Sequence, residues 1–480
     1  MINLRDHKKL FVLGKRFASF TCILVMLLLV FSCNNLFISG GGSLIIATPG
    51  ARAVTGNEIY TIELTGSSGS SQNKTVSGGS TVQFDDLAPD TYRISVKAAD
   101  DSGAVVLYGT DSATVTAGAT ASATVKMSEV ANDYNSLSNA ISTGGIVYIG
   151  SDIDVASTLT VNTDVTLLPA YKNVTLTKVG DIDLISFSAA GILTVGGNDY
   201  TITLDGDSGN NSLINTNGKG STVYLNRNSI VTNNKGTGLT IKGENATTKK
   251  AYLYLNGGTI SNNESGGVSL SNADFVMNDG LINGNSLSSN TYGGAAVSMT
   301  STTGIAFIMK GGTISDNQCT GNGGAIYGTT RCSFTMDGGS IEGNSATGNG
   351  GGVYLSNGTF IMNGGTIVDN KVTGDSSLGH GVYFSDGDSG DLKFSGNPVI
   401  DKNNDVYYKI SQAIKISGPL TGATVATITF NEYKDTTQVL SADNGVTLAN
   451  EVGKFAVTPN PADDTQWTID TAGKLQQVTQ

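Results

Sequence analysis

The sequence predicts an all-β protein in which a β-sandwich is followed by a solenoid of stacked β-coils. Short alternations of apolar and polar residues recur along the chain, which is typical of strands with one buried face. The motif Ile-x-x-Asn repeats at intervals of 22 to 33 residues, about the length of one solenoid coil. The chain contains 63 Gly and only 7 Pro, and the Gly recur at fixed places, as turns between strands require.

The first 32 residues are predicted to be an export signal. Basic residues from Arg5 to Arg16 precede the mostly apolar run 17–31, which is shorter than the roughly 20 residues of a spanning helix. The segment Val30-Phe31-Ser32-Cys33 resembles the bacterial lipobox, which implies that Cys33 becomes the lipid-modified N-terminus of the mature chain. We therefore expect a lipoprotein signal peptide over 1–32 and a tether over 33–42. An uncleaved anchor and ordinary secretion are the alternatives.

Residues 43–127 are predicted to form the β-sandwich. Strand-like alternation, as in Tyr92-Arg93-Ile94-Ser95-Val96, is separated by turn signals such as Pro89-Asp90. The segment 87–92 resembles a corner found in immunoglobulin-like, fibronectin-III-like and carboxypeptidase-regulatory-like domains. The resemblance implies that the Tyr92 hydroxyl bonds back to nearby backbone. We interpret this domain as a spacer between the membrane and the solenoid.

A short helix is predicted at the beginning of the solenoid. Tyr134, Leu137 and Ile141 fall on one helical face, and Gly144-Gly145 ends the helix. Such a helix can cover the first coil, whose strands would otherwise be open to edge-to-edge association.

Residues 132–420 are predicted to be the solenoid itself, with about three short strands in each coil. One strand ends in Met, as in Phe307-Ile308-Met309, one contains Thr-Ile, and one follows a Gly-Gly step, as in 323–327. Equivalent positions of successive coils should stack, with Met filling a core column as an unbranched apolar side chain. The two predicted columns are Met277, Met309, Met336 and Met362, and Ile260, Ile282, Ile314, Ile341, Ile367 and Ile400.

Three strands in coils of this length resemble the right-handed parallel β-helix of the pectin-lyase-like class. The Gly-Gly-Ala-Ile and Ile-x-x-Asn patterns are similar to those of chlamydial polymorphic outer-membrane proteins and treponemal-type surface lipoproteins. The resemblance covers residues 132–480. It implies a right-handed parallel β-helix followed by a β-rich C-terminal cap over 421–480.

The repeated Asn is interpreted as internal scaffolding. Stacked side-chain amides can donate to and accept from neighbours one coil away, and buried polar groups are normally paired. The predicted ladder consists of Asn233, Asn263, Asn285, Asn317, Asn344, Asn370 and Asn403.

No catalytic residue, metal site or cofactor is predicted. Enzymes of the pectin-lyase-like class use clustered carboxylates, which should recur at one position on adjacent coils. Asp316 and Asp369 share a repeat position, but Gly343 lies between them, and Asp337 has no carboxylate at the same position beside it. His380 is expected to lie in an exposed turn.

Cys319 and Cys332 are predicted not to be bonded to each other. A strand of about six residues separates them and spans roughly 20 Å, whereas a disulfide needs Cα atoms within about 7 Å.

The formal net charge of −12 disfavours nucleic acid as a partner. We expect an exported monomer, held at the outer membrane or cell surface through its N-terminal lipid. The leading function is adhesion through a host protein or glycan, without catalysis. A polysaccharide lyase or glycoside hydrolase is the second hypothesis, and a passive coat component is the third. Exposed aromatic rows would favour a binding protein, and aligned acids would favour an enzyme.

Overall fold

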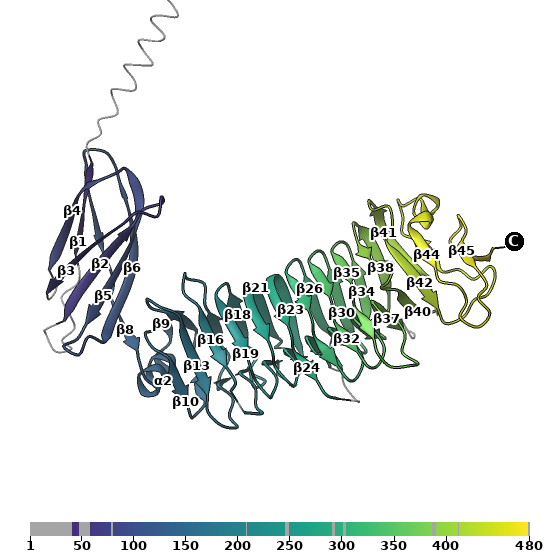
Figure 1. The fold of residues 1–480 in the computed structure, drawn as a ribbon, viewed down its shortest axis with the longest axis horizontal. Coiled ribbons are helices and arrows are strands. Elements are labelled where there is room, and N and C mark those ends of the chain that lie inside the picture. The colour runs from purple at the N-terminus through teal and green to yellow at the C-terminus, as the bar shows by residue number, and fades with distance from the viewer. Residues whose placement is uncertain are drawn as a thin grey trace, which may run out of the picture. The chain divides into compact units, whose positions relative to one another are not determined.

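A computed structural model of the chain is mostly β-strand. It describes residues 41–47, 58–77, 80–207, 209–244, 249–289, 293–300, 304–385, 390–410 and 412–478. The chain divides into two compact units, Met1–Glu129 and Val130–Gln480 (Figure 1). The predicted signal peptide and Cys33 lie outside the described residues.

The first unit contains two groups of strands that share one apolar core. In one group β1 (Gly42–Ala47) lies between β4 (Thr81–Leu87), which is antiparallel to it, and β7 (Thr120–Thr124), which is parallel. The other group is antiparallel, in the order β3 (Ser71–Ser77), β2 (Ile59–Thr65), β5 (Asp90–Ala99) and β6 (Val105–Val115). Leu44, Ile62 and Ile94 from the two groups are fully buried in one cluster.

The predicted bond of Tyr92 is confirmed. Its hydroxyl donates to the carbonyl oxygen of Ala88 at 3.1 Å, and the side chain is 6% exposed. A buried Tyr normally needs such a partner for its hydroxyl. The bond therefore fixes the turn that leads into β5.

The predicted helix is also present, as α2 (Tyr134–Thr143). Its N-cap Asp133 accepts from the backbone N–H of Ser136 at 2.8 Å, which satisfies a donor that the helix start leaves free. Leu137 and Ile141 are fully buried in the core of the second unit. The division between the two units falls within β8 (Ser128–Ala131). The helix α2 is the first element after β8 in the second unit.

Within its described residues, the second unit contains four stacks of parallel strands (Figure 1). Three of them run along most of the unit, and the fourth spans only four coils. We name them the Met, Ile, Tyr and short stacks. The Met stack contains β9 (Gly145–Ile149), β12 (Val165–Pro169), β15 (Ile192–Val195), β18 (Thr222–Asn226), β21 (Ala251–Ser261), β23 (Ala273–Asn283), β26 (Ile305–Met309), β30 (Cys332–Met336), β34 (Thr359–Met362), β38 (Leu392–Gly396), β41 (Ile414–Leu420) and β43 (Leu440–Ala442).

The Ile stack contains β10 (Ile153–Val155), β13 (Val174–Lys178), β16 (Ile202–Asp205), β19 (Ser229–Thr232), the second halves of β21 and β23, β27 (Thr313–Ser315), β31 (Ser340–Glu342), β35 (Thr366–Val368) and β39 (Val399–Ile400). The Tyr stack contains β11 (Leu159–Val161), β14 (Ile185–Phe187), β17 (Ile214–Asn215), β20 (Leu239–Lys242), β22 (Val268–Ser271), β25 (Val297–Met299), β29 (Ile326–Gly328), β33 (Val353–Ser356), β37 (Val382–Ser385), β40 (Val406–Lys409), β42 (Ala426–Phe430) and β44 (Phe455–Val457).

The short stack adds two-residue strands to four coils between the Ile and Tyr stacks. It contains β24 (Ser286–Leu287), β28 (Gln318–Cys319), β32 (Ser345–Ala346) and β36 (Lys371–Val372). The coils of β28, β32 and β36 therefore have four separate strands each, one more than the sequence predicted. In the coil of β24, the single strand β23 serves both the Met and the Ile stacks. The long parallel stacks fit a β-helix.

The predicted Met and Ile columns are confirmed. Register pairing places Met277 beside Met309 and Ile282 beside Ile314, and each column continues coil by coil. All members are at most 2% exposed. Cys319 and Cys332 are buried free thiols, as predicted.

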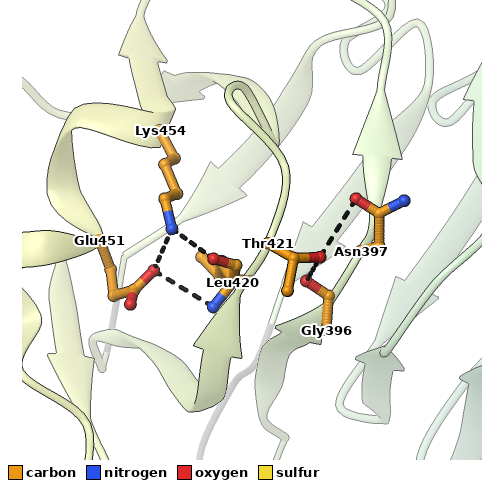
Figure 2. Close-up of polar contacts among 6 residues, drawn as sticks. All are labelled: Gly396, Asn397, Leu420, Thr421, Glu451 and Lys454. Atoms are coloured by element: carbon orange, nitrogen blue, oxygen red, sulfur yellow. Dashed lines mark hydrogen bonds and ion pairs between the residues drawn. The ribbon is translucent and has the colours of Figure 1, made fainter. Parts of the chain in front are cut away.

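Residues near the predicted end of the solenoid are held by side chains from further along the chain. The backbone N–H of Leu420 donates to Glu451 Oε2 at 3.2 Å, and its carbonyl accepts from Lys454 Nζ (Figure 2). Lys454 also pairs with Glu451 at 2.8 Å, close to η1 (Leu448–Asn450) and η2 (Val452–Lys454). Parallel pairing continues past residue 420 through β42, β43 and β44. The antiparallel pair β45 (Trp467–Ile469) and β46 (Leu475–Gln477) follows.

Candidate functional site

The asparagine ladder lies inside the second unit. In each step the side-chain Nδ2 donates to Oδ1 of the next Asn at 2.8–3.0 Å, and the backbone N–H donates to the same oxygen at 2.9–3.1 Å. The members are at most 3% exposed, so the ladder is scaffolding and not a surface for ligands. It consists of Asn263, Asn285, Asn317, Asn344, Asn370 and Asn404.

The predicted positions Asn233 and Asn403 are wrong by one residue. Strand pairing aligns Val231, not Ile230, with Ile260, so Asn234 is the buried residue at this corner and Asn233 is exposed. At the other end, Asp401 accepts from the N–H groups of Asn403 and Asn404, which adds one residue to the turn. Asn404 therefore points inward, while Asn403 is exposed.

The acids that share a repeat position have a conformational role. The residue before five of the six ladder Asn has a left-handed backbone, with φ of 54° at Asp316, 65° at Gly343 and 55° at Asp369. Among L-residues, Asp and Asn tolerate this region best, and Gly adopts it freely. The alternation of Asp with Gly is therefore explained by the turn.

The other polar residues considered from the sequence are also held by local contacts. Asp337 accepts from Asn363 Nδ2 at 2.8 Å. His380 is exposed, as predicted, and its Nδ1 accepts from the N–H of Val372 at 3.4 Å. Within the described residues, no group of three or more His, Cys, Asp or Glu side chains could hold a metal ion. In the same part of the chain, no helix is both long and apolar enough to cross a membrane.

Four Tyr side chains form an outward ladder along the Tyr stack, which the sequence interpretation did not single out. Tyr327, Tyr354, Tyr383 and Tyr407 occupy one register position in successive strands. Neighbouring ring centroids are 5.3, 4.9 and 5.1 Å apart, with interplanar angles of 10°, 8° and 15°. The last three are half-buried, so part of each side chain reaches the surface while the stacked ring faces cover one another. The signal in the sequence was the Tyr that follows Ile or Val in each of these strands, as in Val353-Tyr354.

The same outward column carries small polar residues on either side of the tyrosine ladder. Towards the N-terminus it contains Thr240, Ser269 and Ser298, and Thr429 follows Tyr407 at the other end. The column is therefore a continuous strip of hydroxyl groups with an aromatic section. Its neighbours are one strand spacing apart, about 4.8 Å.

Burial raises the pKa of the Tyr354, Tyr383 and Tyr407 phenols. Tyr354 and Tyr407 raise the pKa of Tyr383 further, because ionising one phenol would place a negative charge beside the next. The hydroxyls therefore remain protonated at neutral pH and can donate hydrogen bonds to a ligand.

A second aromatic pair lies on a different stack. Tyr224 and Tyr254, on the outward side of the Met stack, stack at 4.8 Å with an interplanar angle of 13°. Two residues make a much shorter aromatic section than the tyrosine ladder.

Comparison with known proteins gives no family assignment. No protein-family model matches the chain. No curated protein matches it either. No solved structure matches it.

Proposed function

We propose that this protein is a non-catalytic binding protein of the cell surface that contacts a host protein or glycan through the tyrosine ladder. The ladder is the observation that carries the proposal. Tyr is enriched at interfaces because its ring supplies rigid contact area and its hydroxyl bonds to polar partners. Four such side chains in register offer an extended contact to a partner that lies along the stack.

The roles of the repeated acids also support binding over catalysis. Asp316 and Asp369 are separated by Gly343, and all three serve the left-handed turn. Carboxylate pairs of glycoside hydrolases need defined separations of roughly 5–9.5 Å across a shared cleft. A turn residue that alternates with Gly does not supply such a pair in adjacent coils.

We further propose a detailed fold for each unit, a likeness to two groups of surface proteins, and a lipid anchor. The second unit is a right-handed β-helix with three principal strands per coil, and the first unit is a β-sandwich spacer. The repeat motifs support a likeness to treponemal-type surface lipoproteins and chlamydial polymorphic outer-membrane proteins. Cys33 carries the lipid that holds the protein at the outer membrane.

The binding proposal predicts that Tyr354→Ser/Tyr383→Ser weakens binding at least about tenfold, because central Tyr residues of interfaces contribute about 2 kcal/mol each. Ser occupies the same outward position at Ser269 and Ser298, so the fold accommodates this substitution. The measurement is binding of purified protein to immobilised matrix proteins and to neutral and uronate polysaccharides.

The control is Tyr224→Thr/Tyr254→Thr, which removes the stacked pair on the Met stack. Thr194 and Thr335 occupy the same outward column as Tyr224 and Tyr254. The control therefore also replaces two stacked Tyr rings with a small hydroxyl residue that the column already contains. Binding should stay within about twofold. Equal weakening by the two double variants would contradict the proposal, and so would release of unsaturated sugar product from a uronate polysaccharide.

The anchoring proposal predicts that Cys33→Ala abolishes incorporation of labelled fatty acid into the expressed protein. Lipid attachment needs the thiol at the cleavage site, and a single chain gives only marginal membrane binding, so several chains on Cys33 are expected. Cys22→Ala, in the apolar run of the signal, is the control and should keep its label. Undiminished labelling of the Cys33 variant would reject the anchor.

A further inference from the structure

A pocket lies on the outward side of the Tyr stack directly beside the tyrosine ladder. Its volume is about 240 Å³, and its lining includes Thr237, Ser265, Ser269, Leu287, Ser298 and Thr300. Register pairing runs from Ser269 to Ser298 and then to Tyr327, so the pocket and the ladder share one column.

The pocket exists because the aromatic section stops at Tyr327. From that coil onward a ring covers the outward position, whereas Ser298 and Ser269 leave it open. Gly266 and Gly294 also line the pocket and have left-handed backbones, with φ of 97° and 80°. Because they lack side chains, the pocket is bounded there by backbone.

Two of the pocket hydroxyls already donate to the protein backbone, and two others are available to a ligand. The hydroxyl of Ser265 donates to the Lys235 carbonyl at 2.7 Å, and that of Thr237 donates to the Ser265 carbonyl at 3.1 Å. Within the part of the chain that the structure describes, the hydroxyls of Ser269 and Ser298 make no hydrogen bond. Both residues are half-buried, so a ligand that bonds to them would be partly removed from water.

We propose that this pocket binds one ring of a neutral carbohydrate, whose chain continues along the tyrosine ladder. None of the lining residues is charged, and the half-buried side chain of Leu287 adds an apolar wall. A sugar ring has an apolar C–H face and a hydroxyl edge, which match the apolar wall and the serine hydroxyls. The volume is below the range of about 300–1,000 Å³ for larger ligands, which suits a single ring.

This inference rests on the proposed binding function and adds its ligand class. The ligand is recognised by neutral hydroxyl groups, and the net charge of −12 opposes an anionic uronate chain. Either a free polysaccharide or a glycan on a host protein could present such a ring. The first experiment uses free oligosaccharides, which isolate the shared chemistry.

The test titrates purified protein with neutral linear trisaccharides of glucose, mannose or N-acetylglucosamine, and with trigalacturonate. The blocking variant is Ser298→Tyr, whose ring extends the tyrosine ladder and occupies the pocket. Its control is Ser186→Tyr, an equivalent outward substitution in the same column, remote from the pocket. Ser298→Tyr should weaken binding at least about tenfold, while Ser186→Tyr should leave it within about twofold.

A second variant avoids added bulk. Ser269→Ala/Ser298→Ala should weaken the neutral trisaccharide about tenfold, because each hydrogen bond contributes about 0.5–1.5 kcal/mol. The inference is overturned if no neutral trisaccharide binds the unchanged protein, if Ser298→Tyr binds as well as Ser186→Tyr, or if trigalacturonate binds equally well. If Tyr354→Ser/Tyr383→Ser loses binding to matrix proteins or polysaccharides while Ser298→Tyr keeps trisaccharide affinity, the pocket is rejected and the ladder's function stands.

Discussion

Asn317→Ala is expected to destabilise the second unit by about 4 kcal/mol, because it leaves several buried polar groups without partners at about 1–3 kcal/mol each. Asn317 is fully buried in the middle of the asparagine ladder. Its Oδ1 accepts from both nitrogens of Asn285, and its Nδ2 donates to Asn344 Oδ1 and to the Ile282 carbonyl. The measurement is the shift in urea unfolding, followed by a signal from the second unit.

Adjacent residues at the C-terminal end of the asparagine ladder provide its control. Asn404→Ala removes the last acceptor, which takes hydrogen bonds from the backbone and side chain of Asn370. Asn403→Ala changes an exposed residue and should alter stability by less than about 0.5 kcal/mol. Similar losses for these two variants would contradict the structural register. A loss below about 1 kcal/mol for Asn317→Ala would contradict the ladder's stabilising role.

The sequence predicted the buried columns because one residue type recurs at one place in each coil. Met309, Met336 and Met362 each end the first strand of their coils, and Ile stands three residues before five of the six ladder Asn. The polar strand β3 was missed, because six of its seven residues are exposed and give no apolar alternation. The two-residue strands of the short stack were missed because a strand of that length has no periodicity.

The register at the ends of the asparagine ladder depends on contacts that the motif does not contain. Ile230 and Val231 are both apolar, and only pairing with Ile260 shows which one faces inward. At Asn403 the motif is intact, but the turn is one residue longer. Tyr327 and Tyr354 of the tyrosine ladder were visible in the sequence after Gly-Gly steps. The ring stacking and the neighbouring pocket depend on strand register.

A buried lysine at the N-terminal side of the asparagine ladder could not be predicted, because its partners lie 31 to 56 residues further along the chain. Lys178 is fully buried, and Nζ donates to the Gly209 carbonyl at 3.1 Å, the Asn211 carbonyl at 2.6 Å and Asn234 Oδ1 at 2.6 Å. The three acceptors match the three donors of an ammonium group. Burial lowers the Lys178 pKa, while the negative charges of Asp183 and Asp181 oppose that shift.

Lys178→Met is therefore expected to destabilise the second unit by about 3 kcal/mol, because a stem of similar length remains while three buried oxygens lose their donor. The substitution tests the hydrogen bonds separately from packing, because the Met side chain keeps the apolar contacts of the lysine stem. That stem is tightly packed, since a Cβ atom added to Gly209 would lie only 2.7 Å from Lys178 Cε. Lys250→Met is the control, since it removes a partly exposed pair with Asp274 at 2.7 Å, which contributes at most about 1 kcal/mol. Equal shifts in urea unfolding for the two variants would show that the buried hydrogen bonds of Lys178 do not stabilise the corner at Asn234. A larger shift for Lys178→Met would show that the buried ammonium group stabilises this corner by bonding to Asn234 Oδ1, which, among the described residues, accepts no hydrogen bond from a ladder amide.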